Sequence, residues 1–422
     1  MSKIYETNDE YDFYFSEWEK ARDFTHSEKK VKSGGEKYIP RLRGNDDNEY
    51  QTYLSFGSLS MFAKKVLMSY IGMVQRKQYT ITHPDIIYDT KYPITPNKKT
   101  LYRFITDVLY NRFLFGRVGI LVDYIDADER SYMFLYDTFS ILEVKYDVYG
   151  NLNKVVLTQS DNTLLKLELI DGVYTQQKFD IETEEPVTEL ITPIKNGNTF
   201  DYIPFVIMGD YIPFITEIID LNYHHFRLSV DLQYALHWVG IPTPTVTGIT
   251  NEEDVPDFIG TSKYISIPDP NGKAFFMEFE GKGLDSIKDR MEDIRNDIAS
   301  LSINLILNDQ FTSKTATQSI IDNNNSSSSL AGVVKDISAD LTTIFNIMMD
   351  WNIMETEFVI KLNTDFVASK MDPQLLRELT NMLLSGTISY ETYWKALQDG
   401  ELVDSDKSAE EEKTNIETQP LI

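Results

Sequence analysis

The stretch GLDSIKDRMEDIRNDIASLSINLIL, residues 283–307, carries the most regular pattern in the sequence. Seven of its large apolar residues are spaced alternately by three and four, the spacing of a narrow seam along an amphipathic helix. Aspartates recur every fourth residue, and because each helical residue turns by about 100° they form a stripe roughly opposite the seam. The sequence therefore predicts one long helix with an apolar edge, Leu284, Ile287, Met291, Ile294, Ile298, Leu301 and Leu305, and an anionic edge, Asp285, Asp289, Asp293 and Asp297.

The segments that flank this helix also follow recognisable patterns. A second long helix is predicted from Pro213 to Val239, because apolar residues recur at helical spacing after a proline that a first helical turn tolerates. Prolines and glycines then leave only short strands, at Tyr264–Ile267 and Ala274–Phe279. Residues 308–330 hold runs of asparagine and serine that predict a mobile polar loop. Two long helices thus enclose a small β-rich insertion.

The rest of the chain predicts a mixed body with helical ends. Short β-branched and aromatic runs between Gly119 and Phe205, with a type I′ turn at Asp171-Gly172, predict antiparallel sheet. Further segments are expected as helices at 11–25, 59–74, 101–114 and 332–351, a linker at 26–37, a strand at 358–366, two capped helices after Asp372, and an acidic flexible tail from Glu401.

Composition excludes several classes of protein. The 422 residues predict two to three domains, and 42% hydrophobic residues exclude disorder as the main state. A net charge of −26 disfavours a general nucleic-acid clamp. The absence of cysteine excludes disulfides, thiolate zinc sites and cysteine nucleophiles. We expect no signal peptide and no transmembrane span, because charges interrupt every apolar stretch.

Motifs for catalysis are not found. His224 and His225 are adjacent, and on a helix their side chains point about 100° apart, so they cannot share one metal ion. No phosphate-binding glycine loop and no Gly-x-Ser-x-Gly elbow occurs. The aspartate stripe is more typical of a solvated or channel-facing surface than of a differently tuned acid and base pair. The sequence therefore predicts no enzyme, with no catalytic residue, no cofactor and no metal.

Several tracts resemble one family, the portal proteins or head-to-tail connectors of tailed bacteriophages, in a branch known only as a domain of unknown function. The tracts are Tyr38–Gly44, Phe115–Tyr124, His237–Gly248, Leu362–Phe366, Met371–Thr380 and Gly386–Trp394. The likeness runs in the same order over about Tyr38 to Val403.

The resemblance implies an α+β portal-type fold with an α/β wing, a two-helix stem, a small β-rich clip and a helical crown, assembled as a cyclic ring. When this organisation is assigned to the sequence, the expected parts are an N-terminal arm and linker (1–55), wing (56–210), stem helix 1 (211–239), clip (240–282), stem helix 2 (283–308), tunnel loop (309–330), returning wing helix and strand (331–370), crown helices (371–400) and acidic flexible tail (401–422).

The resemblance also suggests roles for particular residues. We expect the seam Leu284–Leu305 to pack on the first stem helix and on a neighbouring subunit. We expect the DNA channel to be lined by Asp285, Asp289, Asp293, Asp297, Lys314, Asn323, Asn324, Asn325 and Ser326, and partner contacts at the clip by Pro256, Asp257, Phe258, Asp269 and Asn271. The resemblance also implies an acidic residue near the place of Lys314, and this sequence departs from that pattern.

The function that the resemblance implies is a ring channel at the unique capsid vertex for DNA packaging and ejection. The expected partners are further copies of the chain in a dodecamer, the major capsid protein, the terminase large subunit, head-tail adaptor or tail proteins, and double-stranded DNA bound without sequence specificity, with no membrane. The protein would assemble in the host cytoplasm and reside in the virion. Two alternatives stay open: a non-viral oligomeric scaffold that uses the 284–305 seam, and a cytosolic carboxylate enzyme with Asp289 and Asp293 in a cleft.

Overall fold

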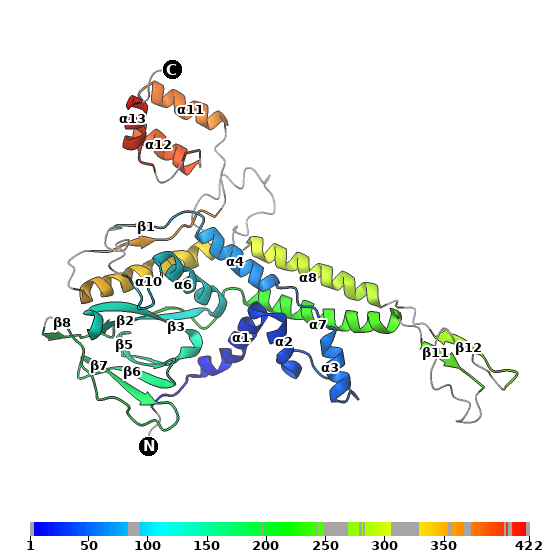
Figure 1. Ribbon diagram of the computed structural model, residues 1–422. Coiled ribbons are helices and arrows are strands. Elements are labelled where there is room, and N and C mark those ends of the chain that lie inside the picture. Colours follow the sequence, from blue (N-terminus) through cyan, green and yellow to red (C-terminus); the bar gives the residue numbers. More distant parts are fainter. Residues whose placement is uncertain are drawn as a thin grey trace. The chain divides into compact units, whose positions relative to one another are not determined.

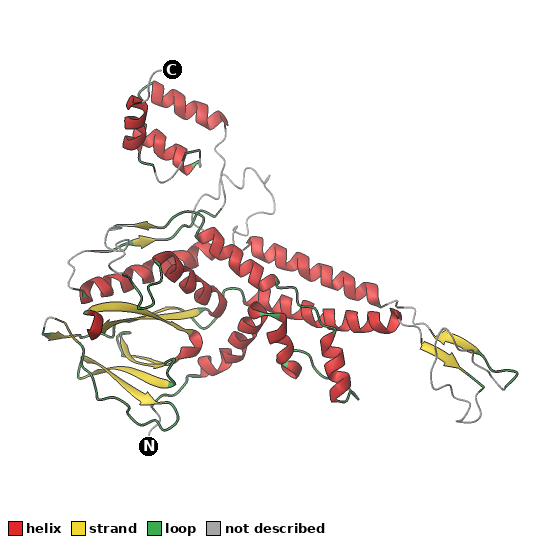
Figure 2. Ribbon diagram, viewed as in Figure 1, coloured by secondary structure: helices red, strands yellow, loops and turns green. Residues whose placement is uncertain are grey.

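The computed structural model combines helices with antiparallel sheets, the α+β class that the sequence predicts (Figures 1 and 2). It describes residues 4–82, 93–195, 197–240, 243–248, 269–277, 281, 283–304, 329–352, 357–366, 373–400, 402–403 and 407–418. The chain divides into two compact units. The first comprises Met1–Ser69, Asp85–Ile303 and Thr343–Thr356, and the second Tyr70–Pro84, Asn304–Thr342 and Glu357–Ile422.

The first unit contains a buried central strand that follows helix α6 directly. Helix α6 (Leu101–Phe115) ends at Gly116, whose φ is +82°. A Cβ at Gly116 would lie 2.2 Å from the carbonyl oxygen of Ile212, so only glycine fits this turn. Strand β2 (Arg117–Ile125) then pairs antiparallel with both β3 (Arg130–Asp137) and β10 (Phe205–Gly209).

A four-stranded antiparallel meander forms the second sheet of this unit. Its strands are β4 (Ile141–Tyr146), β5 (Leu152–Thr158), β6 (Thr163–Ile170) and β7 (Val173–Asp180), in that order. At the β6–β7 turn, Asp171 and Gly172 have φ values of 52° and 77°, as the predicted type I′ turn requires. Two short strands, β8 (Ile194–Lys195) and β9 (Asn198–Thr199), pair beyond it. The prediction of antiparallel sheet between Gly119 and Phe205 is confirmed.

The N-terminal region is more ordered than the predicted arm and linker. Helix α1 (Asp9–His26) is followed by helix α2 (Glu28–Ser33), a 3-10 turn η1 (Gly35–Lys37) and helix α3 (Asp47–Ser55). Ser27 caps α2 by accepting a hydrogen bond from the amide of Lys30, and Asp46 with Glu49 forms a capping box at α3. These local caps make helices of a stretch whose glycines and charges predict a linker.

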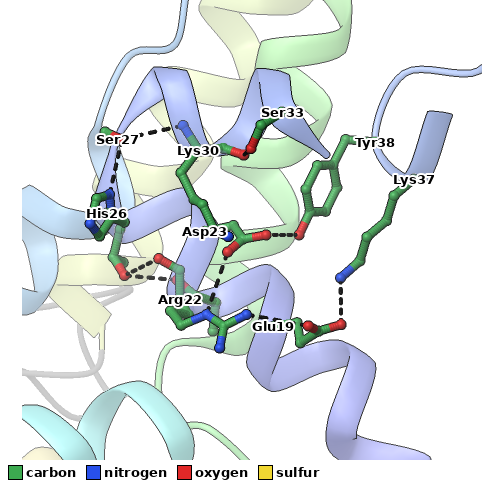
Figure 3. A network of polar contacts seen from close by, with 11 residues as sticks. Glu19, Arg22, Asp23, His26, Ser27, Lys30, Ser33, Lys37 and Tyr38 are labelled. Atoms are coloured by element: carbon green, nitrogen blue, oxygen red, sulfur yellow. Dashed lines mark hydrogen bonds and ion pairs between the residues drawn. The ribbon is translucent and has the colours of Figure 1, made fainter. Parts of the chain in front are cut away.

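A chain of polar contacts fixes η1 to α1 (Figure 3). The ammonium of Lys37 lies 2.8 Å from the carboxylate of Glu19, which also pairs with Arg22 at 3.2 Å. The hydroxyl of Tyr38 donates to the buried carboxylate of Asp23 at 2.7 Å. Burial and this carboxylate raise the pKa of Tyr38. The residues after α2 are therefore held in place on α1.

Polar groups also attach the next helices to each other. Helix α7 (Thr216–Gly240) lies against the start of helix α4 (Phe62–Val74), where the buried amide of Asn222 donates to the carbonyl of Ser60 at 2.8 Å and accepts from the amide of Ala63 at 3.0 Å. Both polar ends of Asn222 are thus satisfied although its side chain is fully buried. Helix α10 (Ser329–Trp351) carries Trp351, whose ring contacts Phe200 at 4.7 Å.

The second unit contains a strand pair and a C-terminal group of helices. Strand β1 (Thr80–Ile81) pairs with β13 (Ile360–Lys361), so the strand expected over 358–366 is limited to two residues. Helices α11 (Pro373–Leu384) and α12 (Tyr390–Asp399) follow, with the predicted caps at Ser389 and Gly400.

The acidic tail contains a helix that the sequence analysis does not anticipate. Helix α13 (Ala409–Thr418) lies inside the range predicted to be flexible. Ser408 and Glu411 exchange hydrogen bonds of 3.1 Å, a capping box that starts the helix. The indole nitrogen of Trp394 donates to the carbonyl of Lys407 at 3.0 Å, which links the tail to α12.

Candidate functional site

The seam predicted from the sequence lies on helix α8 (Leu284–Asn304). Met291, Ile294 and Ile298 are buried, with 9%, 1% and 5% of their surfaces exposed. Leu284, Ile287 and Leu301 are half-buried, and Leu305 lies outside the described residues. The apolar edge of α8 is therefore covered most completely at its centre.

Helix α7 covers this edge in the antiparallel direction. At one end, Leu284 and Val239 both lie beside Gly281 in the turn before α8. At the other end, Arg295 of α8 lies close enough to His225 of α7 for its positive charge to lower the pKa of that histidine. Figure 1 shows α8 running alongside α7. A two-helix hairpin is thus formed from segments separated by the β-rich insertion.

His225 is a buried polar group without a hydrogen-bond partner at this helix pair. Its side chain is 2% exposed, and both ring nitrogens lack a hydrogen bond. Its ring meets Phe62 edge-on at 5.1 Å, and burial lowers its pKa. The neighbouring His224 is exposed, so the two side chains point apart as the sequence predicts. In the described part of the chain, no group of three or more histidines and carboxylates could hold a metal ion.

The predicted anionic edge of α8 faces solvent. All four aspartates are exposed. Two of them carry ion pairs within the helix, from Asp285 to Lys288 at 3.3 Å and from Asp297 to Arg290 at 3.8 Å. Over the described residues, Asp289 and Asp293 have no ion pair. Since these groups sit in water, their individual pairs contribute little to stability.

The insertion between the helices contains one described strand pair. Strand β11 (Thr243–Val246) pairs antiparallel with β12 (Ala274–Met277). Among the residues predicted to contact partners, Asp269 and Asn271 belong to a tight turn before β12, where the carboxylate of Asp269 accepts from the amide of Asn271 at 2.8 Å. Pro256, Asp257 and Phe258, and the loop residues Lys314, Asn323, Asn324, Asn325 and Ser326, lie outside the described residues.

Sequence analysis missed a buried cation that organises the first unit. Arg117, at the start of β2, is 3% exposed and donates to the carbonyls of Thr138 and Ile141 at 3.2 and 3.0 Å. Its guanidinium lies 4.3 Å from the ring centre of Tyr211 and 5.6 Å from that of Trp18. Burial lowers the pKa of Arg117. An arginine opening an apolar strand is the one sequence signal for this site.

No helix in the described ranges is both long and apolar enough to span a bilayer. The family described as "Domain of unknown function (DUF4055)" matches residues 214–352, which contain α7, the insertion, α8 and α10. None of the curated proteins compared with the chain matches it.

Several solved structures are similar to the chain at low sequence identity. A chain of "Virion of native gene transfer agent (GTA) particle" matches with a TM-score of 0.43 and 10% identity, covering 85% of this chain and 96% of that one. A chain of the neck of an empty GTA particle matches with a TM-score of 0.40 and 10% identity, covering 85% and 95%. An HK97 family phage portal protein from Corynebacterium diphtheriae matches with a TM-score of 0.33 and 10% identity, covering 76% and 95%. A phage portal protein is thus among the solved structures to which the chain is similar, and the sequence resemblance names the same family.

Proposed function

We propose that this chain is the subunit of a portal-type ring, a channel through which double-stranded DNA enters and leaves a particle. The observation that carries the proposal is the helix pair α7–α8, which encloses an inserted strand pair and has an apolar edge buried inside and carboxylates outside. The sequence tracts that resemble portal proteins lie on both sides of this pair, and one of them, His237–Gly248, runs from the end of α7 into the insertion. In this assignment α7 and α8 are the stem and the β11–β12 insertion is the clip.

The charge of the helix pair suits a conduit for a polyanion. A surface that neutralises phosphates gains affinity for DNA with each contact, and such affinity would slow the movement of the duplex. Asp285, Asp289, Asp293 and Asp297 would instead repel phosphates if they line the lumen. We therefore assign the exposed edge of α8 to the channel wall, together with the loop that contains Lys314 and Asn323–Ser326.

The remaining apolar surface of the seam is assigned to contacts between subunits. Leu284, Ile287 and Leu301 are only half-buried by the chain's own helices. Ring closure would cover them, because each subunit in a cyclic assembly presents the same surface to its neighbour. The clip, including Asp269 and Asn271, would then face terminase during packaging and adaptor or tail proteins afterwards. The ring would sit at the capsid vertex, against the major capsid protein.

Imaging of the purified protein tests this function. Negative-stain electron microscopy is expected to show rings with a through-hole that admits duplex DNA. Native mass spectrometry is expected to give about 0.6 MDa, twelve copies of a 48.8 kDa chain. A dimer or trimer under every assembly condition would instead support a scaffold that uses the same seam. A stable monomer that turns over a substrate, and that loses this activity in the Asp289→Asn variant, would support an enzyme.

A further inference from the structure

An exposed aromatic surface lies where α1 meets the β4–β5 hairpin and the segment before α7. Phe13 is 71% exposed and meets Tyr14 edge-on at 5.0 Å, and Tyr14 stacks on Tyr211 at 6.4 Å. Tyr146, 57% exposed, lies near Tyr211, and Ile212 is 52% exposed. We call Phe13, Tyr14, Tyr146, Tyr211 and Ile212 the aromatic patch. Tyr14 and Tyr211 are half-buried, and the other three side chains are exposed around them. Exposed apolar side chains grouped in this way mark an interaction surface.

Negative charge lies beside the aromatic patch. Asp9, Glu10 and Asp12 are exposed in the first turn of α1, next to Phe13. Within the described ranges none of the three has an ion pair. Aromatic faces and unpaired carboxylates together favour a partner that presents cations with aliphatic side chains, since ring faces attract cations.

The same chain presents such a partner surface at the other end of α1. Lys29 and Lys30 on α2 are exposed, Leu42 is 41% exposed, and Arg43 beside it is exposed. No ion pair holds these three cations in the part of the chain that the structure describes. We call Lys29, Lys30, Leu42 and Arg43 the basic segment. It stands out in a chain whose net charge is −26.

The basic segment is held in position before any partner binds. The contacts of Figure 3 fix η1 to α1 through Glu19, Lys37 and Tyr38. Arg41 pairs with Glu36 at 2.9 Å and with Asp47 at 2.7 Å, on either side of the turn that presents Leu42. A preorganised surface loses little conformational entropy on binding.

The two surfaces cannot meet within one chain. Helix α1 has 18 residues, which makes it about 27 Å long, with the aromatic patch at its start and the basic segment after its end. We propose that the basic segment of one copy docks on the aromatic patch of the next copy, head to tail. This inference rests on the proposed function, because a head-to-tail contact closes into a ring only if its rotation returns to the first subunit.

Engineered disulfides test the contact directly, because the chain has no cysteine of its own. The double variant Phe13→Cys/Leu42→Cys places one thiol on each surface. On mild oxidation it is expected to give a ladder of covalent multimers beyond the dimer on a denaturing gel. Each single variant is expected to run as a monomer on the same denaturing gel, because two copies of the same surface do not meet and their thiols cannot form a disulfide. The matched control Phe13→Cys/Leu190→Cys moves the second thiol to another exposed leucine, 52% exposed, and is expected to give no ladder.

Charge reversal provides a second measurement. Lys30→Glu/Arg43→Glu is expected to lower the fraction of assembled protein at least tenfold. Lys98→Glu/Arg103→Glu, the same reversal at two exposed cations elsewhere, is expected to leave that fraction unchanged. The proposal is overturned if the double cysteine variant gives no ladder, if either single variant gives dimers as readily, or if the reversed variant assembles normally. Rings that form without the ladder would leave the proposed function standing, whereas a wild type that never assembles would end both.

Discussion

Helices α1 and α8 are both acidic and amphipathic, but they are held in different ways. Helix α1 buries Trp18, Ala21 and Phe24 completely, against rings and a cation supplied by distant segments. Helix α8 buries three residues, Met291, Ile294 and Ile298, and keeps most of its surface in water. Contacts with distant segments hold α1 in place, whereas α8 is held by the regularly spaced apolar residues along one of its edges. Helix α1 is thus anchored in the body along its buried side, whereas α8 is held along one narrow edge.

The largest loss of stability is expected at α1. Trp18 is fully buried, its indole nitrogen donates to the carbonyl of Tyr211 at 2.9 Å, and Arg117 lies over its ring. Trp18→Ala is expected to lower the free energy of unfolding by about 3–5 kcal/mol, because it leaves a cavity and an unpartnered carbonyl. This loss is measured by urea titration, with unfolding monitored by circular dichroism. Trp18→Phe should recover part of the loss, and a loss below about 1 kcal/mol for Trp18→Ala would show that α1 is not anchored there.

A smaller loss is expected at α8. Ile294→Ala removes the most buried side chain of the seam and is expected to cost about 2–4 kcal/mol in the same titration. Ile303 lies on the same helix and is 53% exposed, so Ile303→Ala is expected to change stability by no more than about 0.5 kcal/mol. Equal losses at the two positions would mean that spacing alone does not decide which edge of α8 packs.

This comparison explains what the sequence can predict. The three-four spacing of α8, the apolar strands of the sheets and the caps at Ser389 and Gly400 are local signals, and the structure has each of them. Helices α2 and α13 also begin with local caps, at Ser27 and Ser408, but they bury little apolar surface, so periodicity does not reveal them.

The candidate site also has features that the sequence predicts and features that it does not. Its seam and aspartates follow from spacing, so the sequence predicts which edge is apolar and which is acidic. The proximity of Arg295 to His225, and the position of Arg117 among rings, depend on segments far apart in the chain. Such contacts are set by the three-dimensional fold, and no short motif encodes them.

A moderate dependence of stability on pH is expected from the α7–α8 contact. His225 faces Arg295 of α8 and Phe62 of α4, and its pKa is lowered from the usual 6.5. The unfolded state therefore binds more protons as the pH falls through 6.5, and stability is lost from there downward. His225→Leu is expected to reduce the stability difference between pH 5 and pH 7.5, measured by urea titration. His224→Leu, at the exposed neighbour, is expected to keep that difference, and equal behaviour of the two variants would contradict a role for burial.

The smallest effect on stability is expected at the acidic edge, where the effect on DNA is the informative measurement. Asp289 and Asp293 are exposed and have no ion pair among the described residues, so Asp289→Asn/Asp293→Asn is expected to change the free energy of unfolding by at most about 0.5 kcal/mol.

If these side chains line a lumen, Asp289→Lys/Asp293→Lys adds cations along the path of the duplex. The assembled variant should then retain DNA that the wild type releases, and the retention should fall steeply with salt because phosphate contacts release counterions. The same charge reversal at Glu182 and Glu189, both exposed between β7 and β8, is the control. Equal retention by both variants would place the acidic edge of α8 outside the channel.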